Sequence, residues 1–165
     1  MAVDVLAARA RALGPHADDA WVAGVRLGDE DVLLVKPLLY MNRSGGPVAR
    51  LLAEARAEAS ALVVLVDDVA LDLGTIRVRE RGSPGGHNGL RSISEALGTD
   101  EYPRIRIGVR RGEIPADLAG YVLDPFPEDE VPLVQEAVGA AAEAAECLLR
   151  EGAAAAMNRF NGRRP

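Results

Sequence analysis

The chain has 165 residues, 48% of them hydrophobic and 27% charged, and its formal net charge is −6. This length predicts one domain, over residues 1–165, that is large enough to enclose a core. The acidic net charge argues against a generally basic nucleic-acid binder, and the sequence shows neither an apolar run of membrane length nor a signal peptide. A single cysteine, Cys147, argues against a disulfide framework or a cysteine zinc site. It favours a reducing compartment, so we predict a cytoplasmic protein without membrane contact.

The charge is distributed unevenly along the sequence. Residues 77–111 contain eight arginines and four acidic residues, so this segment is basic within an acidic chain. Arginine presents a planar fork of N–H donors that suits phosphate oxygens. The segment is therefore either a docking surface for one polyanion or a solvated strand face.

The first third of the chain alternates helical and strand patterns. Apolar periodicity predicts a helix over residues 2–13, followed by strands over 21–27 and 32–35. A loop over 37–43 then leads to a second helix, over about 44–59, whose apolar positions lie on one face.

An uninterrupted apolar run, residues 62–66, predicts a strand buried on both faces. It ends in Asp67-Asp68, and the carboxyl ends of central strands are where open α/β sheets place their ligand sites. A lone aspartate at a strand end is more often a cap. Residues 75–79 alternate apolar residues with arginine, which predicts a half-exposed strand.

The most unusual stretch is the glycine-rich loop, residues 82–90, which contains His87 and Asn88. Glycine at this density allows the backbone to approach a ligand or another backbone closely. The apolar residues that follow predict a short helix, so the loop would deliver both side chains to a helix N-terminus, which favours an anion or a polarised carbonyl. The alternative is a tight loop in which Asn88 is only the helix N-cap.

The remaining elements complete a mixed α/β order. We expect a strand over residues 104–109, a short apolar segment at 121–123, a long alanine-rich helix over 128–150 and a last helical turn or two at 153–158. The predicted fold is a single-domain three-layer α/β/α architecture around a twisted mixed sheet.

Three ordered motifs resemble those of one family. Residues 40–45 look like its F/Y-M-N-x-S-G signature, and residues 67–77 resemble its H-D-[DE]-L-D-x-x-x-G-x-x-[RK] segment. Residues 85–90 match its G-G-H-N-G-L, and the R-I-R-I-G of residues 104–108 follows at the expected place. The chain thus resembles the bacterial-type peptidyl-tRNA hydrolases over nearly its whole length, residues 3–161.

The resemblance implies an enzyme that cleaves the ester between a peptide and tRNA, recycling the tRNA without a metal or cofactor. In this family a histidine acts as general base, an aspartate orients it, and asparagine amides bind the peptide and polarise the ester carbonyl. The implied partner is peptidyl-tRNA, and the implied state is a monomer.

Residue roles carry over by motif. Asp67 matches the aspartate that orients the base, and Asn42 and Asn88 match the substrate-binding amides. His87 matches a histidine beside the site, not the base itself. The resemblance further implies contacts from Tyr40 and Met41 at the wall of the site, and from Arg77, Arg79 and Arg106 to tRNA phosphates.

The resemblance also has gaps. The family opens with a strand, a G-L-G-N-P-G loop and the segment with the catalytic histidine, about 20–25 residues that have no counterpart here. Val66 and Ala70 stand where the family has histidine and a second acid. We therefore expect the first strand and the base to be missing and the chain as written to be inactive. Either translation starts upstream, which we favour, or the protein is a catalytically dead paralogue that binds RNA or peptidyl-tRNA.

Overall fold

The computed structural model describes residues 1–12, 14, 19–114 and 118–161. Its α-helices are α1 (Ala2–Arg9), α2 (Gly45–Ala55), α3 (Asn88–Leu97), α4 (Leu118–Leu123), α5 (Val131–Glu151) and α6 (Ala153–Phe160). Two short 3-10 helices, η1 (Met41–Arg43) and η2 (Ala59–Ala61), flank α2. The strands are β1 (Ala20–Leu27), β2 (Glu30–Pro37), β3 (Val64–Asp72), β4 (Ile76–Arg79) and β5 (Arg104–Arg110).

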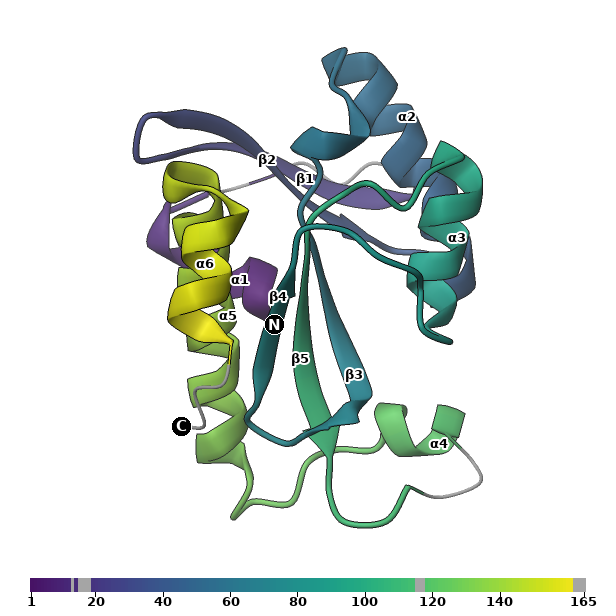
Figure 1. The fold of residues 1–165 in the computed structure, drawn as a ribbon, viewed down its shortest axis with the longest axis vertical. Coiled ribbons are helices and arrows are strands. Elements are labelled where there is room, and N and C mark those ends of the chain that lie inside the picture. Colours follow the sequence, from purple (N-terminus) through teal and green to yellow (C-terminus); the bar gives the residue numbers. More distant parts are fainter. Residues whose placement is uncertain (13, 15–18, 115–117, 162–165) are drawn as a thin grey trace.

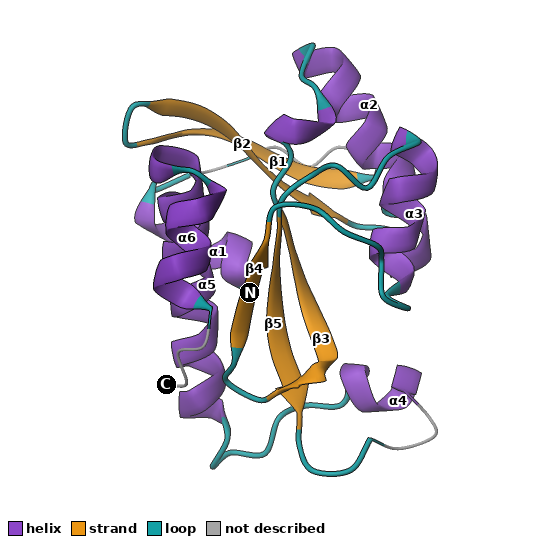
Figure 2. Cartoon of the chain, in the orientation of Figure 1, coloured by secondary structure: helices purple, strands orange, loops and turns teal. Residues whose placement is uncertain are grey.

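The described strands form two separate sheets (Figure 2). The larger has the order β3-β5-β4, in which β3 runs parallel and β4 antiparallel to β5. The smaller is the β1–β2 hairpin, in which Leu27 pairs with Glu30 across a two-residue turn. Gly28 adopts a φ of 65° in that turn, a conformation that glycine adopts without the strain of a side chain.

Helices cover both faces of the larger sheet (Figure 1). On one face α5 and α6 pack against β4 and β5, and buried alanines of α5 such as Ala141 and Ala142 let the helix approach the strands closely. On the other face, α2 and α3 enclose a second cluster around Val48, Leu90 and Tyr102. These two layers confirm the expected three-layer α/β architecture with a mixed sheet.

Several boundaries differ from the sequence-based predictions. The first helix ends at Arg9 rather than at residue 13, because Ala10 closes it and Arg11 has a φ of 52°; residue 13 itself lies outside the described residues. The second helix ends at Ala55, where Arg56 turns into the left-handed region. The apolar segment at 121–123 belongs to α4.

Strand β3 differs most from its prediction. It continues through Asp67 and Asp68 to Asp72, so neither aspartate lies beyond a strand end. The run at residues 62–66 is only half-buried, not buried on both faces. The reason is its position: β3 pairs with β5 along one edge, and its other edge borders an open cavity.

Candidate functional site

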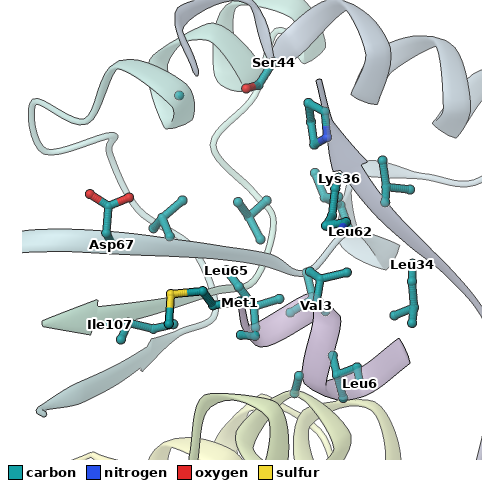
Figure 3. Close-up of a pocket in the computed structure, with 18 of the residues that line it drawn as sticks. Met1, Val3, Leu6, Leu34, Lys36, Ser44, Leu62, Leu65, Asp67 and Ile107 are labelled. Atoms are coloured by element: carbon teal, nitrogen blue, oxygen red, sulfur yellow. The ribbon is translucent and has the colours of Figure 1, made fainter. Parts of the chain in front are cut away.

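The cavity lies between the two sheets. Its volume is about 930 Å³, and β2, β3 and the start of α1 contribute to its walls. Apolar side chains such as Val3, Leu34 and Leu65 line it, with Met1 extending beneath β3 toward Ile107 (Figure 3). Polar groups gather at its rim, where Asp67, His87 and Ser44 are found. The cavity therefore joins an apolar interior to the residues that the motifs single out.

Asp67 and His87 meet at this rim. His87 Nε2 lies 3.7 Å from Asp67 Oδ1, and the His87 side chain is 15% exposed. The neighbouring His87 imidazole holds the pKa of Asp67 below its usual value, while partial burial acts in the opposite direction. Asp67 is therefore ionised at neutral pH and can stabilise a positive charge beside it.

His87 caps the N-terminus of α3. The alternative prediction, in which Asn88 is the N-cap, is therefore wrong. His87 Nδ1 accepts a hydrogen bond of 3.1 Å from the backbone N–H of Leu90. An imidazole nitrogen that accepts carries no proton, so Nε2 carries it in the neutral ring. With one nitrogen accepting from Leu90 and the other directed at Asp67, neither is available to take a proton from water.

Asn88 is exposed in the first turn of α3, and Arg91 donates from Nη2 to its Oδ1. Arginine has only donors, so this contact identifies which end of the amide is oxygen. The Asn88 Nδ2 group is consequently presented as the donor end.

The η1 segment approaches α3 at two glycines. Gly45 N–H donates to Ser92 Oγ at 3.0 Å, and a Cβ on Gly45 would lie 2.0 Å from the carbonyl oxygen of Ser92. A Cβ on Gly89 would lie 2.9 Å from Met41 Cγ and 3.0 Å from His87 Cε1. Because residues 45 and 89 are glycines and have no side chain, η1 and the loop before α3 can pack closely together.

The structure therefore brings some predicted site residues together and leaves others apart. Met41 and His87 both line the cavity, beside Asp67. Asn42 lies in η1 with its side chain exposed, and Tyr40 is 81% exposed. The wall predicted from Tyr40 and Met41 is thus built by Met41, while Tyr40 projects into solvent.

The predicted phosphate-binding arginines lie on adjacent strands. Arg77 of β4 pairs in register with Arg106 of β5, and Arg79 pairs with Arg104. Arg106 Nε lies 2.7 Å from Oδ2 of the buried Asp68, so an internal carboxylate already balances its charge. Arg77 is half-buried and Arg79 is exposed. Of the three predicted phosphate-binding arginines, only Arg106 is paired with a carboxylate among the described residues.

Arg104 is a site-shaping residue that the sequence analysis missed. It is only 1% exposed and donates to the backbone carbonyls of Gly82, Asp100 and Tyr102. Its guanidinium also lies 4.2 Å from the centre of the Tyr102 ring. It thereby holds the start of the glycine-rich loop against β5. An arginine that alternates with isoleucine signals a half-exposed strand, so no local pattern indicates this burial.

The described residues offer neither a metal site nor a membrane-spanning helix. No group of three or more histidine, cysteine or acidic side chains among them is placed to hold a metal ion. No helix in the described ranges is long and apolar enough to span a membrane. Cys147 is buried, as expected of a small apolar residue, and burial raises the pKa of its thiol.

Comparison with known proteins adds independent evidence. A family model described as "Peptidyl-tRNA hydrolase" matches residues 1–165. The chain is 45% identical over 136 residues to the peptidyl-tRNA hydrolase of Alkaliphilus oremlandii, covering 82% of this chain and 73% of that one. It is 46% identical over 143 residues to that of Syntrophomonas wolfei, covering 87% and 77%.

A solved structure shares the fold. The crystal structure of peptidyl-tRNA hydrolase from Acinetobacter baumannii superimposes with a TM-score of 0.91 at 28% identity, covering 99% of this chain and 84% of that one. These comparisons give no support to the catalytically dead alternative. The motifs, the fold and the relatives agree, and the chain belongs to the peptidyl-tRNA hydrolase family.

Proposed function

We propose that the protein hydrolyses the ester between the peptide and the terminal ribose of peptidyl-tRNA. The observation that carries this proposal is the meeting of Asp67 and His87 at the cavity, with Asn88 next to His87 in the chain, in a member of this family. Water attacks the ester carbonyl carbon, the bond from that carbon to the ribose oxygen breaks, and the ribose oxygen takes a proton. The products are a peptide acid and free tRNA.

Each polar group has a role that its geometry permits. The Nδ2 of Asn88 donates to the ester carbonyl oxygen, where negative charge develops in the transition state. Asn42 supplies a second amide on the facing η1 segment. Asp67 stabilises the positive charge that a histidine base acquires when it accepts the water proton.

The general base that accepts the proton from water must be another residue. Nδ1 of His87 accepts from the Leu90 N–H and Nε2 carries the proton of the neutral ring, 3.7 Å from Asp67 Oδ1, so His87 is not the base. His16 lies outside the described residues. We assign the base to a segment that precedes Met1 in a longer form of the protein and fills the cavity beside Asp67.

The cavity favours a β-strand in this place. Among the described strands, β2 pairs only with β1 and β3 only with β5, so each presents one unpaired edge. Such edges satisfy their backbone groups by taking up a further strand. The walls are apolar, and Met1 already enters the cavity. This chain covers 73% of the Alkaliphilus oremlandii protein and 84% of the Acinetobacter baumannii structure. Both relatives therefore contain residues that have no counterpart in this chain.

We place the tRNA phosphates against Arg77 and Arg79 of β4. The two arginines are two positions apart on one strand, so both project from the same face of the sheet. Arg77 and Arg79 make no ion pair among the described residues, so they contribute more than Arg106, whose partner is Asp68. A monomer that acts in the cytoplasm completes the proposal.

The test combines mass and activity. The intact mass of the protein purified from its native cells is measured first, and the same sample is assayed for peptide release from an N-blocked aminoacyl-tRNA. A mass a few kilodaltons above 17.4 kDa, together with hydrolysis, supports the proposal. A mass equal to 17.4 kDa, with steeply salt-dependent tRNA binding and no hydrolysis, overturns it.

A further inference from the structure

We propose that His87 is a positioning residue that fixes the separation between the Asp67 carboxylate and the Asn88 amide. The inference deepens the proposed function, because it concerns how that site is held together. It rests on two contacts of the one imidazole ring, with the Leu90 amide and with Asp67, and on the lack of room for a side chain at Gly89 beside the ring.

The first contact determines the proton position. Because Nδ1 accepts from the Leu90 N–H, a proton at Nδ1 would remove that hydrogen bond. The capped state of α3 therefore requires the tautomer with hydrogen on Nε2. The hydrogen bond that caps α3 and the Nε2-protonated tautomer of His87 therefore occur together.

The second contact uses that proton. Nε2 is buried, has no hydrogen-bond partner within bonding distance in the described structure, and has Asp67 Oδ1 3.7 Å away. A buried N–H group without a partner is costly, so a carboxylate oxygen directed at it has a stabilising role even at this separation. A small closure of the site would make this contact a charge-assisted hydrogen bond.

The space at Gly89 limits the motion of the ring. The imidazole lies so close to Gly89 that a Cβ there would be 3.0 Å from His87 Cε1 and 2.9 Å from Met41 Cγ. The ring and Met41 of η1 thus both border the position where a side chain on Gly89 would project. Asn88, the next residue along the chain, is fixed to α3 by Arg91. A displacement of His87 would consequently change the position of Asn88 relative to Asp67.

The test begins with a measurement that does not depend on activity. Nitrogen NMR of the native protein, with labelled histidine, reports the protonation of each ring nitrogen of His87. We expect hydrogen on Nε2, and we expect Asp67→Asn to shift the Nε2 signal strongly and the Nδ1 signal little. A proton on Nδ1, or an Nε2 signal that does not respond to Asp67→Asn, overturns the proposal even if the protein hydrolyses peptidyl-tRNA.

A double-mutant cycle then separates positioning from capping. His87→Asn retains a side-chain acceptor for the Leu90 amide but is too short to reach Asp67. We expect Leu90 amide protection to persist and kcat to fall about tenfold with little change in KM. In the Asp67→Asn background the same substitution should have little further effect on kcat. An equal loss in both backgrounds would assign His87 a structural role only. If no form of the protein hydrolyses the substrate, the proposed function fails, and the NMR result alone decides the role of His87.

Discussion

Gly45 and Ser92 join the two polypeptide segments that carry Asn42 and Asn88, the proposed substrate-binding amides. The Gly45 N–H donates to Ser92 Oγ at 3.0 Å, and a Cβ on Gly45 would lie 2.0 Å from the Ser92 carbonyl oxygen. The contact packs the start of α2 against the middle of α3. The position of η1, and with it Asn42, therefore depends on the absence of one methyl group.

Gly45→Ala tests this dependence. We expect the free energy of unfolding to fall by about 1–3 kcal/mol, because the clash is with backbone, which has little freedom to move. Chemical denaturation provides the measurement. Gly46→Ala is the matched control: nothing lies within 4 Å of a Cβ there, and alanine favours a helix by up to about 1 kcal/mol. Equal effects of the two substitutions would contradict the steric explanation.

Arg104→Met removes the buried guanidinium, so the carbonyl of Gly82 loses its donor and the carbonyl of Asp100 keeps only the long 3.4 Å bond from the Gly82 N–H. We expect a loss of about 2–3 kcal/mol in unfolding free energy, together with faster amide exchange in the loop over residues 82–87. Arg79→Met, at the exposed position paired with Arg104 in the sheet, should change stability by no more than about 0.5 kcal/mol. The prediction fails if the two methionine variants unfold alike.

Asn161 protects the edge of β4. Its Oδ1 accepts from the Val78 N–H at 2.7 Å, and its Nδ2 donates to the Val78 carbonyl at 3.1 Å, as a neighbouring strand would. Asn161→Ala should cost about 1–3 kcal/mol in unfolding free energy, since both backbone groups lose their partner. The control is Asn158→Ala, which alters an exposed side chain of α6. Unchanged thermal stability of Asn161→Ala would show that water replaces the amide without loss.

The pKa of Asp67 predicts a pH dependence of stability. The folded pKa is lowered below the usual value of 3.8, so the unfolded chain binds the proton more tightly. The stabilisation is therefore present above pH 3.8 and is lost as the pH falls through the lowered folded pKa. Urea unfolding at several pH values should show the difference between wild type and Asp67→Asn shrinking across this window. A difference that grows as the pH falls would have the opposite sign and refute the pairing with His87.

Asn88→Asp tests the donor role of the amide. Aspartate keeps an oxygen for Arg91 but removes the Nδ2 donor, so the helix start is preserved while the carbonyl loses its partner. We expect kcat/KM of the native enzyme for an N-blocked aminoacyl-tRNA to fall about ten- to hundredfold. Arg91→Lys is the control, because lysine retains a cation beside Asn88. Unchanged turnover in Asn88→Asp would remove this residue from the site.

Local features of this protein were determined by the sequence itself. The strand over residues 21–27 and the helix after the glycine-rich loop depend on residues a few positions apart, and both were predicted close to where they occur. The motifs at residues 40–45 and 85–90 are also short and continuous, so they indicated the family from the sequence alone. Backbone propensity and turn chemistry act over short distances, so their signals can be seen in the chain alone.

Only the tertiary structure decided how these segments meet. Asp67 and His87 are twenty positions apart, and their approach depends on the packing of β3 against the loop that β5 and Arg104 hold. The burial of Arg104 and the capping of α3 by His87 rather than Asn88 have the same origin. Long-range packing and shared hydrogen bonds set these positions, and they depend on contacts between distant segments, which no local pattern of apolar and polar residues specifies.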